Sequence, residues 1–145
     1  MNIHYDHQKL TEVAGQNNLK FVILHGSYAE GKQQYGSDLD IAVVGNRELD
    51  FQGQLKLYDG MSGVFADRID RDLDLKTLHR VDPFFRYEVV RNGLLLYGDP
   101  TAYEEYKLSA HRAHDDAQPL RELERTLINK YQQHLNTVTK QYAQP

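Results

Sequence analysis

The chain has 145 residues, of which 40% are hydrophobic and 26% are charged, as expected for one globular domain with a real core. Its net charge of -4 argues against a general nucleic-acid binder, which carries a basic surface, so we expect no direct nucleic-acid binding. The sequence shows no apolar run long enough to span a membrane and no secretory signal pattern, and the absence of cysteine suits a reducing cytoplasm.

Helices and strands are predicted to alternate along residues 1–100. Apolar spacing and turn residues predict a helix over residues 4–14 that stops at Gly15, a buried strand over 19–24, a brief helix that Ser27 caps and that ends near Gly31, and a strand over 38–44. They then predict a helix over 49–64, a strand in the second half of 68–75, a helix that begins at Pro83 and ends at Asn92-Gly93, and a strand over 94–97.

The C-terminal part is predicted to be helical in two pieces, over about residues 101–115 and, after Pro119, as far as about Tyr142. In the second piece, apolar residues recur at steps of three and four and form a stripe of Leu120, Leu123, Leu127, Ile128, Tyr131, Leu135 and Val138. The stripe either docks on a helical partner or covers the chain's own core, and helix statistics favour the second use at least as much. We expect a domain over residues 1–100, with 101–145 as a helical extension of the same domain.

Two aspartates open the strand over 38–44, ten residues after a Gly-Ser pair. Because successive side chains of a strand point to opposite faces, Asp38 and Asp40 are predicted to share one face, with their Cα atoms about 6.6 Å apart. Two carboxylates on one face repel each other unless a cation lies between them. Mg²⁺ prefers oxygen ligands and often binds together with phosphates, so it is the cation that we expect here.

Metal-assisted phosphoryl transfer also needs a third oxygen ligand that takes a proton from the attacking hydroxyl. Asp74 is the favoured candidate, because its apolar neighbours Leu73 and Leu75 are typical of a carboxylate that points inward from a central strand. Asp70 and Asp72 have the same parity and compete with it. Alternatively, all three aspartates form the solvated face of an edge strand.

The Gly-Ser pair is a candidate phosphate site. Gly26 and Ser27 stand at a predicted strand-to-helix turn, where backbone N–H groups, a hydroxyl and the helix dipole favour an anion. A purely local role is compatible with this, since glycine relieves backbone strain and serine caps helices. Ser37 precedes Asp38 and is a weaker phosphate candidate, because Gly36-Ser37 is typical of a plain turn.

The histidines carry less information. His25 is expected near the site, where we interpret it as a packing residue. His111 and His114 stand three apart on a predicted helix and could form a metal pair, but with no third ligand nearby a solvated role is favoured.

The segment GSYAEGKQQYGSDLDIAVV, which begins at Gly26, resembles the minimal nucleotidyltransferase family of the DNA polymerase β superfamily. The family signature is Gly-Ser, about ten residues, Asp-any-Asp, and a third acid on a neighbouring strand. The segment DLDLKTLHRVDPFFRYEVVRNGLLLYGD resembles the family from that third strand onward, which places Asp74 at the third acid. Two positions depart from the family pattern: His25 stands where phenylalanine is common, and Glu30 where arginine is common.

This resemblance implies an α+β (α/β-type) nucleotidyltransferase fold, with a small mixed β-sheet flanked by helices and a C-terminal helical extension. It also implies an enzyme that uses Mg-ATP, with Asp38, Asp40 and Asp74 as catalytic residues that hold two Mg²⁺ ions. Gly26 and Ser27 would hold the triphosphate, Ser37 would contact it more weakly, and AMP would be transferred as pyrophosphate leaves.

Stand-alone members of this size resemble the antitoxin of a two-gene module whose other product is a HEPN-domain ribonuclease toxin. The resemblance therefore implies transfer of AMP to a toxin tyrosine and a possible hetero-oligomer with the toxin. Two alternatives remain open at this point. One is a nucleotidyltransferase that modifies an antibiotic-like small molecule, and the other is an antitoxin that acts by binding and occlusion only.

Overall fold

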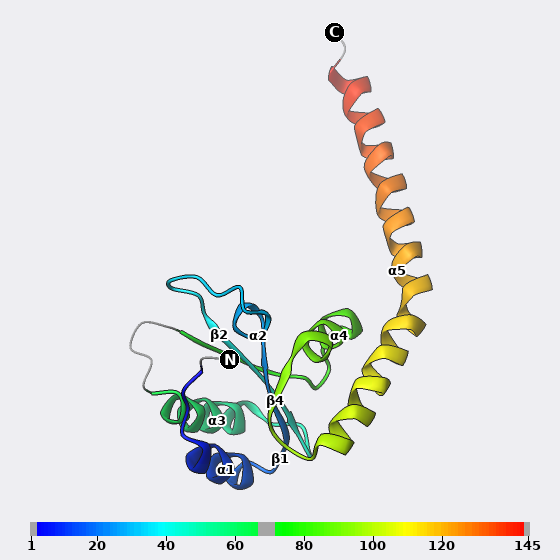
Figure 1. The fold of residues 1–145 in the computed structure, drawn as a ribbon. Helices are drawn as coiled ribbons and strands as arrows, with labels where there is room; N and C mark the ends of the chain where they lie inside the picture. Colours follow the sequence, from blue (N-terminus) through cyan, green and yellow to red (C-terminus); the bar gives the residue numbers. More distant parts are fainter. Residues whose placement is uncertain (1–2, 67–71, 144–145) are drawn as a thin grey trace.

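A computed structural model describes residues 3–66 and 72–143, which form a small mixed β-sheet with helices on both faces (Figure 1). The elements in chain order are α1 (His7–Gln16), β1 (Leu19–His25), α2 (Ser27–Glu30), β2 (Leu39–Gly45), α3 (Phe51–Val64), β3 (Leu73–Thr77), α4 (Pro83–Asn92), β4 (Leu94–Tyr97) and α5 (Pro100–Ala143). This architecture confirms the predicted α+β (α/β-type) fold class. None of the helices within the described residues is both long enough and apolar enough to cross a membrane.

The sheet has the strand order β3-β2-β1-β4. β1 runs antiparallel to both of its neighbours, whereas β2 and β3 are parallel and are joined by α3. This pairing brings the C-terminal end of β1 to the same edge of the sheet as the N-terminal ends of β2 and β3. The residues predicted to form a site therefore come from three adjacent strands.

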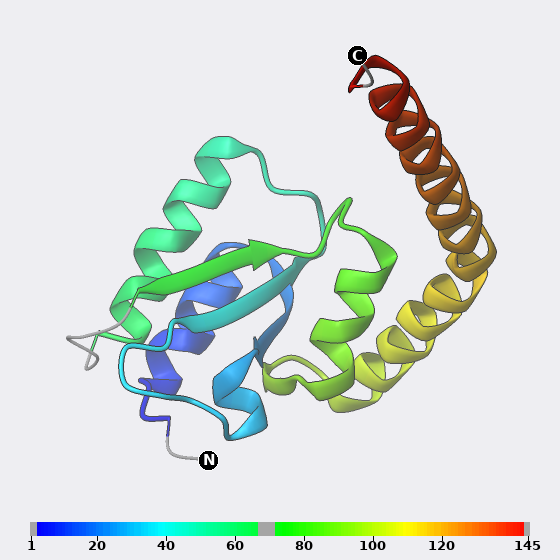
Figure 2. The same cartoon turned by 90° about the horizontal axis from the view of Figure 1, so that it is seen from above.

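Two apolar clusters hold the helices on the sheet. On one face, α1 and α3 bury the side chains Leu10, Val13, Ala14, Leu57, Met61 and Val64. The other face is covered by α4 and the first part of α5 (Figure 2). These helices bury Val89, Val90, Tyr103 and Ala110. Because both faces are covered, β1 and β2 are buried almost throughout, as their continuous apolar runs predict.

Aspartate side chains cap the N-termini of four helices. Asp6, Asp50, Asp82 and Asp99 each accept a hydrogen bond, at 2.7 to 3.0 Å, from a backbone N–H two or three residues ahead. These caps satisfy N–H groups that have no partner inside the helix. The predicted start of α4 at Pro83 is confirmed, with Asp82 as its cap.

Several predicted boundaries were wrong by a few residues. The first helix begins at His7 instead of residue 4, and it continues through Gly15 to Gln16. At α2, Gly26 rather than Ser27 occupies the cap position, and no side chain caps this helix. Asp38 lies just before β2 instead of within it. Asp70 lies outside the described residues.

The largest difference concerns the C-terminal part. α5 is one helix of 44 residues, whereas the sequence predicted two, because Pro119 was expected to end a helix and instead lies inside one. The helix bends where its colour passes from yellow to orange and then projects away from the sheet (Figure 1). A proline that removes one internal hydrogen bond kinks a helix without ending it when the flanking turns are strong.

Candidate functional site

The strands β2 and β3 bring the predicted carboxylates to one edge of the sheet, next to the end of β1. Asp40 of β2 and Asp74 of β3 are paired directly in the parallel register, and His25 of β1 is paired with Asp40 from the other side. Asp38 lies exposed immediately before β2. The register thus places Asp74 beside Asp40, as the sequence predicted for the third acid.

Asp72 occupies a different environment. It stands before β3 and lines a cavity together with Tyr58 and Ser62 of α3. Asp74 instead faces Lys76, whose ammonium lies 5.3 Å from the ring centroid of Phe85 on α4. The parallel register, which pairs Asp74 with Asp40, therefore favours Asp74 over Asp72 as the partner of Asp40.

The environment of the Asp40 carboxyl group disfavours its negative charge. Burial raises the pKa of Asp40, and the negative charges of Asp74 and Asp38 raise it further, while Lys76 opposes this shift. A hydrogen bond between the Asp40 and Asp74 side chains also raises this pKa. The site therefore concentrates negative charge that a cation would relieve.

Lys76 supplies a cation beside this charge. Its Nζ lies 3.1 Å from Oδ2 of Asp74, and both side chains are partly exposed. Sequence reasoning missed Lys76, although it has the same parity as Asp74 and stands two residues further along β3, which was the available signal.

Position 26 requires glycine, because the backbone there lies in close contact with Asp40. The φ of +71° and ψ of -155° at Gly26 fall in a region that is nearly restricted to glycine. A Cβ atom at this position would overlap Oδ2 of Asp40. The close approach places the backbone of the β1–α2 turn directly against the carboxylate.

The two serines behave differently. Ser27 is the first residue of α2 and is half-buried next to Gly26. The hydroxyl of Ser37 accepts a hydrogen bond from the backbone N–H of Gln34 at 2.8 Å, which closes the polar loop before β2. This contact gives Ser37 the local turn role that the sequence also allowed.

His25 is buried, and its side chain packs edge-on against Phe85 with ring centroids 6.1 Å apart. Burial lowers its pKa to about 4, with Lys76 acting in the same direction, so the imidazole is neutral at pH 7. Its Nε2 has no hydrogen-bond partner among the described residues. The packing role predicted for His25 agrees with this environment.

Glu30, at the second position that departs from the family pattern, lies at the end of α2. Its carboxylate accepts a hydrogen bond from Asn92 of α4 at 3.2 Å and pairs with Lys32 at 3.4 Å. It therefore links α2 to α4 instead of supplying a positive charge.

Within residues 3–66 and 72–143, no three His, Cys, Asp or Glu side chains are arranged as a ready metal-binding group. This holds for the aspartates at the sheet edge and for His111 and His114, which both contact Asp115. The roles of Asp38, Asp40 and Asp74 as metal ligands stay predictions.

Comparison with protein families decides the class of this chain. Residues 8–101 match the model of the family described as polymerase beta, nucleotidyltransferase. The chain belongs to this family. The matched nucleotidyltransferase region contains β1, α2, β2 and β3, and with them every residue of the predicted site.

Among characterised nucleotidyltransferases, the chain is similar to the protein adenylyltransferase MntA of Shewanella oneidensis strain MR-1. The two are 34% identical over 80 residues, an alignment that covers 55% of each protein. The chain therefore spans about half the length of this curated relative.

Solved structures show the same fold. A toxin–antitoxin crystal structure with AMP-PNP matches with a TM-score of 0.68 and 25% identity, over 88% of this chain and 98% of that one. A complex of the tri-AMPylated S. oneidensis HEPN toxin with its MNT antitoxin matches with a TM-score of 0.63 and 23% identity, over 87% and 95%. These matches confirm the nucleotidyltransferase fold that the sequence predicted.

Proposed function

We propose that this nucleotidyltransferase transfers AMP from Mg-ATP to a tyrosine of a cognate HEPN-domain toxin and thereby neutralises the toxin. The observation that carries the proposal is the sheet edge where Gly26 contacts Asp40 and Asp40 pairs with Asp74. The 34% identity to the protein adenylyltransferase MntA supports a protein acceptor.

The donor chemistry of the site fits Mg²⁺. Asp40 and Asp74 offer hard carboxylate oxygens, they are close enough to raise a pKa by repulsion, and Asp38 adds to the same field. We propose that these three aspartates hold two Mg²⁺ ions, with Lys76 giving up its contact with Asp74 as they bind. When bound, the ions would neutralise the triphosphate and stabilise the incoming and leaving oxygens of an in-line displacement.

The chain's own residues would position the reactants. The backbone of Gly26 and the hydroxyl of Ser27 would hold the β- and γ-phosphates, and Ser37 would border this site. Asp74 would take the proton of the acceptor hydroxyl, whose oxygen forms a bond to the α-phosphorus. The bond from that phosphorus to the β-phosphate oxygen breaks at the same time, and pyrophosphate leaves.

The distal half of α5 offers a docking surface for the toxin. The apolar stripe does not cover the chain's own core, because its members are mostly exposed: Leu120, Leu123, Leu127, Ile128, Tyr131 and Leu135. An apolar stripe on a projecting helix is typical of a surface that binds another helix. The solved complexes of the same fold with HEPN toxins support a hetero-oligomer of this kind.

We extend the proposal to more than one AMP per acceptor. The toxin in the similar S. oneidensis complex carries three AMP groups. An attached AMP presents new ribose hydroxyls, so the same displacement can act on the product of the first transfer.

Intact-protein mass spectrometry tests the proposal. The purified partner is incubated with Mg-ATP and either the wild-type chain or the double variant Asp38→Ala, Asp40→Ala, and toxicity is scored in parallel by co-expression. We expect mass increases in whole AMP units and loss of toxicity with the wild type only. Neutralisation by both proteins without a mass increase would mean binding and occlusion alone, and transfer to a small hydroxyl compound without any partner would mean a small-molecule enzyme.

A further inference from the structure

A second pocket lies between α4 and α5, outside the carboxylate site. Its volume is about 390 Å³, within the range of small-molecule sites, and its wall includes Phe84, Phe85, Glu88, Gln118, Arg121 and Arg125. Aromatic rings and cations on one concave surface are the groups that bind nucleotides, since the rings stack with bases and the cations pair with phosphates.

The two arginines are available to a ligand. The guanidinium of Arg121 lies over the ring of Phe84, 4.0 Å from its centroid, in a cation–π contact that helps to hold it in place. Among the described residues, neither Arg121 nor Arg125 forms an ion pair. Of the described residues in the wall, Glu88 alone is acidic, so with Arg121 and Arg125 the wall carries a net positive charge that fits a phosphate.

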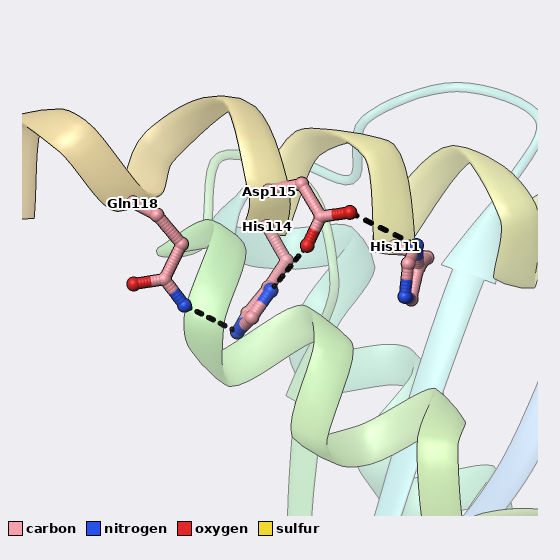
Figure 3. Close-up of polar contacts among 4 residues, drawn as sticks. All are labelled: His111, His114, Asp115 and Gln118. Atoms are coloured by element: carbon pink, nitrogen blue, oxygen red, sulfur yellow. Dashed lines mark hydrogen bonds and ion pairs between the residues drawn. The ribbon is translucent and has the colours of Figure 1, made fainter.

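A hydrogen-bonded row of side chains on α5 fixes the polar wall (Figure 3). Asp115 contacts Nδ1 of His114 at 3.3 Å, and Nε2 of His114 lies 3.4 Å from the amide nitrogen of Gln118. A proton on Nδ1 leaves Nε2 as the acceptor for this amide. Among the described residues, the carbonyl oxygen of Gln118 and the carboxylate of Glu88 have no donor, so both can accept from the amino group of an adenine or from a ribose hydroxyl.

Phe85 connects this pocket to the carboxylate site. The Phe85 ring lines the pocket and packs against His25, with 6.1 Å between the ring centroids. The ammonium of Lys76 lies over the same ring, 5.3 Å from its centroid. Lys76 in turn contacts Asp74 at 3.1 Å. The ring of Phe85 therefore borders both the pocket and the carboxylate site.

We infer that this pocket holds an AMP group that the acceptor already carries, and so allows a second AMP to be added. The inference rests on the proposed function. Arg121 and Arg125 would bind the phosphate of the attached AMP, and Phe84 and Phe85 would contact its base. A ribose hydroxyl of this AMP would attack the α-phosphorus of a new ATP, the α–β phosphate bond would break, pyrophosphate would leave, and Asp74 would take the hydroxyl proton.

Time-resolved intact mass spectrometry separates the first transfer from the later ones. The double variant Arg121→Ala, Arg125→Ala is compared with the wild type and with Arg112→Ala, Lys130→Ala, a control that removes two exposed cations of α5 outside the pocket. We expect the pocket variant to make the first adduct at the wild-type rate and the second at a rate lower by roughly tenfold or more, since charge-assisted hydrogen bonds to phosphate are lost. The control variant should make every adduct normally.

Three outcomes would overturn the inference. The first is that the pocket variant makes the later transfers at the wild-type rate. The second is that it loses the first transfer as well. The third is that the wild type adds only one AMP. Loss of the first transfer would instead assign the pocket to ATP or to the acceptor itself, including an acidic peptide of the partner.

A binding measurement tests whether the pocket binds AMP even if no transfer occurs and the proposed function fails. Calorimetric titration with 5′-AMP in EDTA should show binding to the wild type and to the control variant and loss of binding in the pocket variant. Adenosine, which lacks the phosphate, should bind all three proteins weakly and equally. Equal binding of 5′-AMP by the wild type and the pocket variant would overturn the inference.

Discussion

At the scale of single residues, Gly26 leaves no room for a side chain beside Asp40. Two effects combine there, because the backbone conformation is nearly restricted to glycine and a Cβ atom would overlap the carboxylate. Gly31 separates the two effects. It also has a positive φ, of +69°, but a Cβ atom would meet nothing within 4 Å.

We expect Gly26→Ala to lower the rate of AMP transfer by at least about 100-fold, as the displaced Asp40 loses its position at the reacting centre. Gly31→Ala, the matched control, should cost about 1 kcal/mol of stability and keep most of the activity. Transfer assays and urea unfolding of both variants check this prediction. An active Gly26→Ala enzyme would show that the contact with Asp40 is not needed.

Tyr103 gives a prediction about pH. Its ring is buried against Phe21, and its hydroxyl has no hydrogen-bond partner among the described residues. Burial, followed by the charges of Glu104 and Tyr106, raises its pKa to about 12. Since the unfolded tyrosine titrates near 10, the folded state keeps a proton that the unfolded state loses, and stability falls as pH rises from about 10 to 12.

We expect Tyr103→Phe to equal the wild type in stability at pH 7 or to exceed it by about 1 kcal/mol, because an unpaired buried hydroxyl is removed. Above pH 10 the variant should lose less stability than the wild type. Urea unfolding at both pH values measures this, with Tyr142→Phe, whose ring is 86% exposed, as a control. A variant that is clearly less stable at pH 7 would reveal a partner for the hydroxyl.

At the scale of elements, the sequence predicted every helix and strand of the sheet region because each carries its own local signal. β1 and β2 are continuous apolar runs, and α4 begins with Asp82-Pro83. What local signals could not supply was the register between strands far apart in the chain. Asp72 and Asp74 have the same parity, and only the pairing of β3 with β2 places Asp74 beside Asp40.

The other missed features are likewise tertiary. The parity of β3 places Lys76 and Asp74 on one face, but the sequence could not indicate that the start of α4 meets the middle of α5 to form a pocket. Pro119 does not end a helix as the sequence predicted, because a proline can also be accommodated inside a helix as a kink.

The exposed stripe of α5 carries the next prediction. Leu123 and Leu127 are 54% and 55% exposed, so the double variant Leu123→Glu, Leu127→Glu should unfold within about 0.5 kcal/mol of the wild type. If the stripe binds the toxin, the same variant should lose complex formation, because two charges would enter an apolar interface. Thermal unfolding and size-exclusion chromatography with the partner measure the two effects.

The matched control is Gln133→Glu, Asn136→Glu, which adds the same charge to exposed positions on the opposite side of the helix. The control should bind the partner normally. A stripe variant that binds as well as this control would place the toxin on another surface.

At the scale of the whole molecule, the fold brings the candidate catalytic residues to one edge of the sheet, and the distal half of α5 projects away from the sheet. The antiparallel β1 and the parallel pair β2 and β3 bring Gly26, Asp40 and Asp74 together from distant parts of the chain. α5 begins as part of the core and then projects away from it (Figure 1). In the function that we propose, the sheet edge transfers AMP and the projecting helix holds the acceptor protein in reach.

The most direct test of AMP transfer at this sheet edge compares Asp74→Asn with Asp72→Asn. Both variants remove one negative charge from neighbouring positions, and the backbone hydrogen bond from Leu39 to the carbonyl of Asp72 is kept in both. We expect Asp74→Asn to lower the rate of Mg-ATP-dependent AMP transfer to the partner by at least about 100-fold, and Asp72→Asn to remain near the wild-type rate. Full transfer by Asp74→Asn, with loss of transfer in Asp72→Asn, would contradict the assignment of Asp74 as the third acid.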